Sequence, residues 1–472
     1  MVTYLEELFL FLRPAFSRRA AYVWFVVAWM GIATRTDAYG VTSVVRALSL
    51  APPTYLLLLH FFHSDAWDVE GLMERWWRWV VRQHVAWGLN GRIVLAGDHT
   101  KAPKDARKMP AVTTLHQDSE TASKPSFFRG HHWGCIALVT RLRQRFFATP
   151  LWAAVHEGLE ALGGPPEAQC PKTVRIVTMA QRVAQTMGCH AYLVLDAYFS
   201  VGPVFLAAAV LLGEEGPLLH ILTRAKKNIV AFLPAPPKDP HTRGKQALYG
   251  KKLKLQSLFE LWTDRFTSTT AIVYGQSVTV RYYTVDLLWK PVKGWLRFFW
   301  FETPRGQLLL MTSDLKLQPL DALDAYCHRV TIETLFNALK NVLGGMTYHF
   351  WSKHLERVSR RPKKNQTAVP KSSNLSATRR TLAAIEKYVN LHLLVLGGLQ
   401  LLAMKFAQET FQAAHCWMRT LPKDIPSEFL VKTALANLLR NNDTGFAKSP
   451  IMDFIRDKQQ NPTNIEESQR AA

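Results

Sequence analysis

Two short apolar runs that each meet a carboxylate constrain the fold of this chain more than any other feature. RIVLAG (92–97) is followed by Asp98, and AYLVL (191–195) is followed by Asp196. Both runs are rich in branched aliphatic residues, which is typical of buried strands, so we expect both acids at or near strand ends. A stretch with helical character, 171–188, lies between them. Strand–helix–strand alternation with acids at strand ends indicates an α/β sheet.

The residues around these strands predict further domains. Residues 1–88 contain long Leu- and Trp-rich runs and are expected to form a helical N-terminal domain. Residues 89–358 would form the α/β domain, a mixed sheet flanked by helices. At about 230–320, β-branched and aromatic runs separated by turns predict an antiparallel β subdomain inserted into that domain.

The last third of the chain begins with a basic segment. Residues 359–380 hold seven basic and no acidic residues, together with Pro and Ser, which predicts a flexible linker or a DNA-contacting arm. Residues 381–455 are expected to form a helical C-terminal domain, a candidate for dimerisation. Residues 456–472 have the composition of a disordered tail.

The charge balance points to a polyanionic partner. The chain has 58 basic and 36 acidic residues, a formal net charge of +22, which suits nucleic acid or anionic lipid. Two apolar runs, 20–34 and 388–404, are candidates for membrane spans. Both are shorter than the roughly 20 residues that a span prefers, so buried core helices are expected and no membrane partner.

The five cysteines give no sign of a disulfide framework. They are scattered and odd in number, and no CxxC motif is present, which favours reduced thiols in a cytoplasmic protein. His131, His132 and Cys135 in HHWGC are close enough in sequence to suggest a zinc site. No second ligand cluster accompanies them, so a structural zinc is the less favoured alternative.

The segment YCHRVTIETLFNALK (326–340) predicts a polar stripe along one face of a helix. The segment contains strong helix formers and neither Gly nor Pro, so a continuous helix is expected. At about 100° per residue, its polar members share one stripe roughly 60° wide: Tyr326, Arg329, Glu333 and Lys340. Such a stripe can be a solvated face with one i,i+4 Arg–Glu pair. It can also hold a metal-bound phosphate, and the helix alone leaves both interpretations open.

Three carboxylates now suggest phosphodiester chemistry. Asp98 and Asp196 follow strands and Glu333 lies on a helix, and three such hard oxygen ligands can hold two Mg²⁺ ions. Acids at strand ends also serve as helix caps or loop anchors, so the residue types alone do not decide between these roles.

A resemblance favours the metal-binding interpretation. GDHT around Asp98, LVLDAYF around Asp196 and the spacing Tyr, two residues, Arg, three residues, Glu, six residues, Lys resemble motifs of the DDE transposases of bacterial cut-and-paste insertion sequences. The match is with the branch that carries this Tyr-Arg-Glu-Lys helix signature and a ribonuclease H-like core. HTRGKQALYGKKLKL (241–255) resembles a basic segment of that branch, and the resemblance covers roughly 90–345.

The resemblance implies a role for each of these residues. The implied ligands of two Mg²⁺ ions, for which Mn²⁺ would substitute, are Asp98, Asp196 and Glu333. The implied contacts with the phosphate backbone at the transposon end are Tyr326, Arg329 and Lys340. In this branch the second strand is often cut through a hairpin with an extruded base stacked on an aromatic side chain. Our candidates for that side chain are Trp295 and Trp300.

The expected function is therefore transposition. A homodimer would bind the inverted-repeat ends of a transposon, cut them and join the 3′-hydroxyls to target DNA, in the cytoplasm of a bacterium at the nucleoid. In this interpretation the helical domain at 1–88 would bind DNA and the α/β domain at 89–358 would be the catalytic domain. No P-loop is present, and strand joining exchanges one phosphodiester for another without an energy cofactor. Two alternatives share the fold: a host-retained DNA-binding protein that no longer transposes, and a nuclease without strand transfer.

Overall fold

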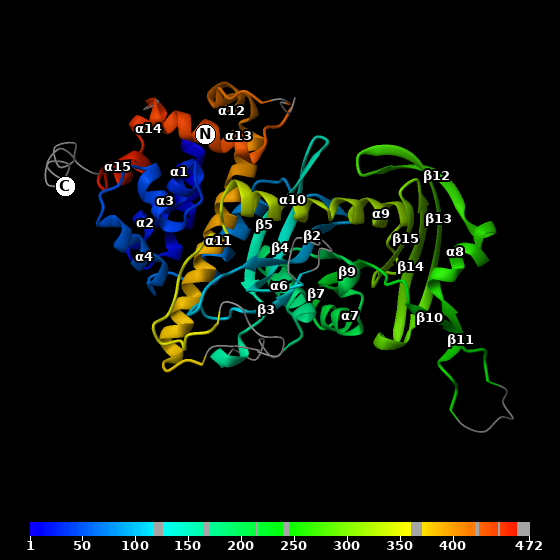
Figure 1. Ribbon diagram of the computed structural model, residues 1–472. Helices are drawn as coiled ribbons and strands as arrows, with labels where there is room; N and C mark the ends of the chain where they lie inside the picture. The colour runs from blue at the N-terminus through cyan, green and yellow to red at the C-terminus, as the bar shows by residue number, and fades with distance from the viewer. Residues whose placement is uncertain are drawn as a thin grey trace, which may run out of the picture.

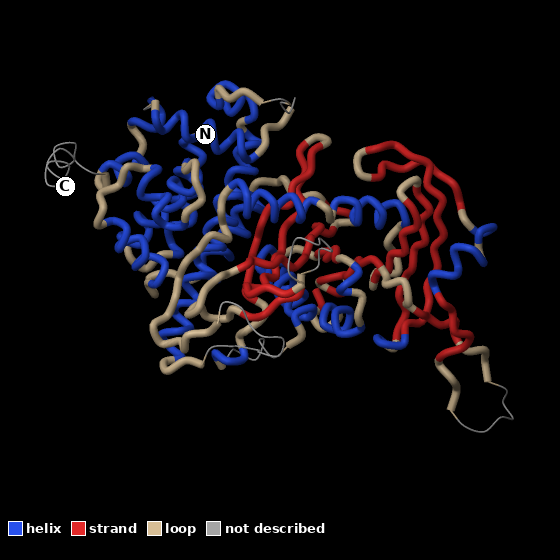
Figure 2. Tube along the Cα trace, in the orientation of Figure 1, coloured by secondary structure: helices blue, strands red, loops and turns tan. Residues whose placement is uncertain are grey.

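One mixed β-sheet runs through the protein, and helices pack around its central strands, as Figures 1 and 2 show for the computed structural model. The structure describes residues 1–117, 126–163, 170–213, 216–238, 245–359, 371–418, 420, 424–441 and 444–459. Half of the predicted basic linker and most of the predicted tail lie outside these residues, as does the first part of the basic segment at 241–255.

The N-terminal part is helical, as predicted. Its five α-helices are α1 (Val2–Leu12), α2 (Arg19–Thr34), α3 (Gly40–Ala47), α4 (Thr54–His63) and α5 (Val69–Arg82). Asp68 caps α5, since its carboxylate accepts a hydrogen bond from the backbone N–H of Gly71. The indole N–H groups of Trp76 and Trp77 donate to the carbonyls of Pro150 and Leu151, so α5 is fastened to the sheet.

The central strands are parallel where the two predicted acidic positions lie. Strand β6 (Ala191–Leu195) pairs in parallel with β2 (Arg92–Pro103) on one side and with β9 (Leu219–Arg224) on the other. The strands that extend the sheet beyond β2 are antiparallel: β1 (Gly88–Leu89), β3 (Thr113–His116), β4 (Phe127–Leu142) and β5 (Arg145–Val155). A two-stranded ribbon stands apart from them: β7 (Leu212–Gly213) and β8 (Gly216–Pro217).

The β-rich segment between Asp196 and Glu333 continues the same sheet. Its strands are β10 (Val230–Pro234), β11 (Tyr249–Lys254), β12 (Thr267–Val273), β13 (Gln276–Trp289), β14 (Gly294–Thr303) and β15 (Gly306–Thr312), with the short helix α8 (Leu258–Leu261) between β11 and β12. Strand β15 pairs antiparallel with β9, so these strands extend the central sheet sideways (Figure 1). That they form an inserted subdomain stays a prediction.

Helices lie on both faces of the sheet near β2. A Cβ on Gly97 would touch Ile176 of helix α6 (Lys172–Met187), so Gly97 faces α6. Successive strand residues point to opposite faces, and Asp98 accordingly faces α9 (Pro319–His328) and α10 (Thr331–Asn337), whose connection supplies its partner Arg329. Helix α7 (Gly202–Ala208) follows β6 and packs beside α6.

The longest helix, α11 (Leu375–Lys405), forms the core between the N-terminal helices and the sheet (Figure 1). Among the described helices it is the one that is long and apolar enough to span a membrane, and 83% of its most apolar window is buried within the protein. The rings of Trp76 and Trp29 occupy the space that a Cβ would take on Gly397 and Gly398, which lets the helices approach closely. The remaining helices are α12 (Ala407–Ala414), α13 (Glu428–Arg440), α14 (Thr444–Ala447) and α15 (Pro450–Arg456).

Candidate functional site

Asp98 lies within strand β2 and not at its end, which corrects the sequence-based expectation. Pairing with β6 stops at Ala96↔Val194, because β6 ends at Leu195. Pairing with β4 continues on the other edge as far as Pro103↔Gly130, and this keeps β2 extended beyond the acid. At Asp98, strand β2 therefore no longer has β6 as a pairing partner, and the Asp98 side chain borders this opening in the sheet.

Asp196 directly follows β6, as predicted. The β2–β6 register, continued by two residues from Ala96↔Val194, places Asp196 level with Asp98. Its carboxylate accepts a hydrogen bond from the backbone N–H of Tyr198 at 3.0 Å and caps a single 3₁₀ turn, Ala197–Phe199. The Thr223 hydroxyl donates to the Asp196 carbonyl at 2.5 Å and ties this turn to β9.

The expected continuous helix over 326–340 is interrupted. Helix α9 ends at His328, α10 begins at Thr331, and residues Ala338–Val342 form a π-helical turn. At the interruption, the backbone N–H of Glu333 bonds to the carbonyl three residues earlier. The consecutive β-branched residues Val330, Thr331 and Ile332 explain it, since β-branching disfavours helix and the Thr331 hydroxyl donates to the carbonyl of His328 at 2.7 Å.

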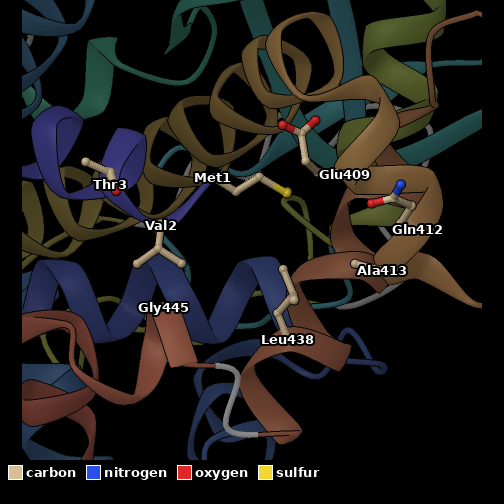
Figure 3. Close-up of a pocket in the computed structure, with 8 residues that line it drawn as sticks. All are labelled: Met1, Val2, Thr3, Glu409, Gln412, Ala413, Leu438 and Gly445. Carbon is tan, nitrogen blue, oxygen red and sulfur yellow. The ribbon is translucent and has the colours of Figure 1, made fainter.

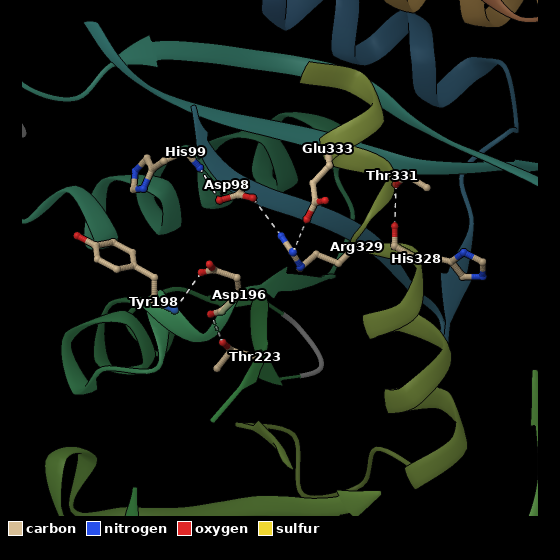
Figure 4. A network of polar contacts seen from close by, with 9 residues as sticks. All are labelled: Asp98, His99, Asp196, Tyr198, Thr223, His328, Arg329, Thr331 and Glu333. Carbon is tan, nitrogen blue, oxygen red and sulfur yellow. Dashed lines mark hydrogen bonds and ion pairs between the residues drawn. The ribbon is translucent and has the colours of Figure 1, made fainter. Parts of the chain in front are cut away.

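Arg329, in the turn between α9 and α10, joins two of the three acids. One guanidinium nitrogen, Nη1, lies 3.0 Å from Asp98 Oδ2, and the other, Nη2, lies 2.8 Å from Glu333 Oε1 (Figure 4). The Arg329 side chain is only 13% exposed, whereas that of Glu333 is 56% exposed. Arg329 thus contacts an acid that lies 231 positions away in the chain.

The two strand acids lie in a setting that favours their protonated forms. The pKa of Asp98 is raised to about 6, because burial and the nearby Asp196 charge together outweigh the attraction of Arg329. Burial also raises the pKa of Asp196, against the attraction of Arg329. Two partly buried carboxylates that repel each other bind a cation readily, because the cation removes both costs.

The other two residues of the predicted stripe also turn towards the protein. The Lys340 ammonium donates to the Thr100 hydroxyl at 2.6 Å, and burial lowers its pKa. Tyr326 is buried, and burial raises the pKa of its phenol. The stripe is therefore not a solvated face, because Arg329 and Lys340 both contact β2.

The two tryptophan candidates differ sharply in exposure. Trp295 is 44% exposed at the start of β14. Trp300, on the same strand, has no exposed surface, and its indole N–H donates to the carbonyl of Leu255 at 2.8 Å. Sequence alternation did not separate the two. A base can reach the face of Trp295 in this structure but not that of Trp300, so Trp295 is the candidate that the structure leaves open to a base.

Histidines behind Asp98 form a cluster that the sequence analysis did not find. His99 is a strand residue, its backbone N–H donates to Asp98 Oδ1 at 2.7 Å, and its ring lies 3.0 Å from the ring nitrogen of His156. The His132 ring packs against His99, and its Nδ1 lies 3.0 Å from Glu157. The sequence signal was Gly134 in HHWGC, since any Cβ there would collide with His156.

The donor types suit a divalent cation, although they do not converge on one point. Among the described residues, no group of three or more His, Cys, Asp or Glu side chains could hold a metal ion as arranged. His131, His132 and Cys135, the candidates for a zinc site, lie within the described residues and form no such group either. Around Arg329, however, carboxylate oxygens already neutralise one cation, and such oxygens are the ligands that Mg²⁺ prefers. Asp98, Asp196 and Glu333 therefore offer the ligand type that suits a divalent cation, and Arg329 occupies one oxygen each of Asp98 and Glu333.

A separate pocket lies far from these residues. Its volume is about 440 Å³, and its lining comes from α1, α12, α13 and α14: Met1, Val2, Thr3, Glu409, Gln412, Ala413, Leu438 and Gly445 (Figure 3). None of the predicted site residues lines this pocket. We place the candidate site at Asp98, where the predicted residues Arg329 and Glu333 meet it.

An α/β protein with acids gathered at the edge of parallel strands belongs to a class that includes metal-dependent nucleases. A family model described as DDE superfamily endonuclease matches residues 12–284, more than half of the chain, and the protein belongs to this family. The family implies a metal-dependent nuclease that acts on DNA. The matched residues include Asp98 and Asp196 but stop before Glu333. A search of curated proteins found no match.

Proposed function

We propose that this protein is a DNA transposase that cuts transposon ends and joins their 3′-hydroxyls to target DNA. The observation that carries the proposal is the Arg329 bridge between Asp98 and Glu333, with Asp196 level with Asp98 on the neighbouring strand. It supports the resemblance of the segment 326–340 to the Tyr-Arg-Glu-Lys signature, because it brings a third acid to the two that the family match covers.

In the proposed reaction, Asp98, Asp196 and Glu333 would hold the divalent cations. Bound cations of this kind activate a water or a 3′-hydroxyl and stabilise the leaving oxygen. Arg329 would offer a forked donor to phosphate oxygens and Lys340 a point charge, and both would position the DNA backbone beside the acids. Trp295 would offer an exposed ring to an extruded base if a hairpin forms.

The rest of the chain would supply DNA and subunit contacts. We assign end binding to the N-terminal helices and the basic residues, since a net charge of +22 matches the phosphate backbone. We further propose a homodimer that holds both ends, acting at the nucleoid in the cytoplasm.

The test is a cleavage assay on a plasmid that carries the gene with its native flanks. Purified protein and Mg²⁺ should give discrete double-strand cuts at a pair of inverted repeats, and a Glu333→Ala control should give none. Joining of the released ends to a second plasmid would distinguish a transposase from a nuclease without strand transfer. Tight DNA binding with no metal-dependent cut would leave a host-retained DNA-binding protein.

A further inference from the structure

The Arg329 bridge has the form of an internal counter-ion. Its two Nη atoms make separate charge-assisted bonds, to Asp98 on the strand and to Glu333 on the helix. The guanidinium therefore uses oxygens that a divalent cation would also need. Two ligands that require the same oxygens exclude each other, and each lowers the apparent affinity of the other.

The side chain of Arg329 is only 13% exposed, but it lies next to an exposed partner at a break in the helix. It lies in the interruption between α9 and α10, and one of its two partners, Glu333, has a side chain that is 56% exposed. A phosphate diester has two oxygens that can accept hydrogen bonds from a guanidinium, as carboxylate oxygens do. Moving from carboxylates to phosphate would therefore preserve the hydrogen bonds of Arg329 while it frees both carboxylates.

We propose that Arg329 keeps Asp98 and Glu333 from binding divalent cations until a DNA phosphate draws it away. DNA binding and cation binding then strengthen each other, because both are linked to the release of one arginine, and this coupling is reciprocal. The inference rests on the proposed function, since it assigns the exchange to the site where DNA would be cut. Cations would then load fully only when substrate is present.

Lys340 supplies the matched control. It is the other cation of the segment that contacts β2, but its ammonium donates to the Thr100 hydroxyl and not to a carboxylate. Removing its charge takes a cation away from the same region without releasing a metal ligand. A general electrostatic effect would raise cation affinity in both variants, whereas the bridge predicts a gain for the Arg329 variant alone.

The experiment measures Mn²⁺ binding to the full-length protein without DNA, from the loss of the free Mn²⁺ signal in electron paramagnetic resonance. We expect Arg329→Gln to bind Mn²⁺ at least about tenfold more tightly than wild type, a typical size for coupling between ligands. Lys340→Gln should stay within about twofold of wild type, a difference well below that coupling. Adding Asp98→Asn to Arg329→Gln should remove the gain. If Arg329→Gln does not fold, Arg329→Met, which keeps an apolar stem but has neither charge nor N–H donors, carries the same test.

Equal Mn²⁺ affinity in wild type and the Arg329 variant would overturn the inference, as would an equal gain in Lys340→Gln or a gain that survives Asp98→Asn. The outcome is separable from the proposed function. A gain in Mn²⁺ affinity in a protein that never cuts DNA would support the exchange and reject the endonuclease assignment. Metal-dependent cutting without the gain would reject the exchange alone.

Discussion

Lys340 donates a 2.6 Å hydrogen bond to Thr100, the next residue after Asp98 on the same face of strand β2. With the Arg329–Asp98 contact, it fixes the helical segment along the strand at two points. Glu333 lies between these points in sequence and is thereby held beside the strand. The position of Glu333 thus depends on Arg329 and Lys340, the two side chains that we also assign to DNA contacts.

The three acids should be required for cutting but not for DNA binding. We expect Asp98→Asn, Asp196→Asn or Glu333→Gln each to lower Mg²⁺-dependent cleavage by at least about 100-fold, because each removes a proposed cation ligand. DNA affinity, measured by fluorescence anisotropy, should fall by no more than about twofold, since most affinity comes from basic contacts with phosphate. Glu260→Gln, at an exposed carboxylate on α8, serves as the control. Normal cleavage by any of the three variants would remove that residue from the proposed set.

Lys340 should contribute to affinity in a salt-dependent way. Replacing it with Ala removes one phosphate contact in our proposal, so the slope of log K against log salt should decrease in magnitude by about 1. The measurement is a salt series of binding isotherms on one duplex. A uniform loss of affinity with an unchanged slope would mean that Lys340 acts only through Thr100.

Stability should depend on pH through Asp98. Its pKa is about 6 in the folded protein and 3.8 ordinarily, so between these values the folded state holds a proton that the unfolded state has lost. Stability from this group therefore falls as pH rises through that window. Asp98→Asn mimics the protonated form, so its free energy of unfolding relative to wild type should increase from pH 4.5 to pH 7, a range that we chose to bracket the folded pKa of about 6. Urea titrations without metal would measure this, and a difference that stays constant with pH would contradict it.

The histidine cluster behind Asp98 should be sensitive to added volume. A Cβ on Gly134 would lie 2.1 Å from His156 Cε1, so Gly134→Ala must displace the ring that contacts His99. We expect a loss of about 1–3 kcal/mol in the free energy of unfolding, typical of overpacking. Gly294→Ala is the control, because its Cβ would meet nothing closer than 3.7 Å. Equal effects of the two substitutions would argue against a tightly packed cluster.

Replacing the buried Trp300 should lower stability, whereas replacing the exposed Trp295 should affect only function. Trp300→Ala should cost about 3–5 kcal/mol, the usual range for a buried aromatic side chain. Trp295→Ala should leave the unfolding midpoint nearly unchanged. If cleavage proceeds through a hairpin, this variant should yield less hairpin DNA on denaturing gels. A stable Trp295→Ala protein with wild-type hairpin yield would exclude Trp295 as the base-stacking residue.

Much of the fold could be predicted from local sequence because the evidence for it is periodic. Runs of branched apolar residues predicted β2 and β6, and an apolar helical pattern predicted α6. The interruption at Arg329 was missed, although Val330, Thr331 and Ile332 carried the signal, since the surrounding helix formers outweighed it. The extension of β2 past Asp98 was missed because it depends on pairing with β4, a contact distant in sequence.

The sequence by itself determined the residue types and their order: two acids after apolar runs, a stripe with Arg329 and Glu333, and a strong positive charge. Only the tertiary structure decided which of these residues meet. It brought Arg329 to Asp98, left Trp295 exposed and buried Trp300. Strand register and packing set these relationships, and both arise from contacts between distant segments, which local periodicity does not encode.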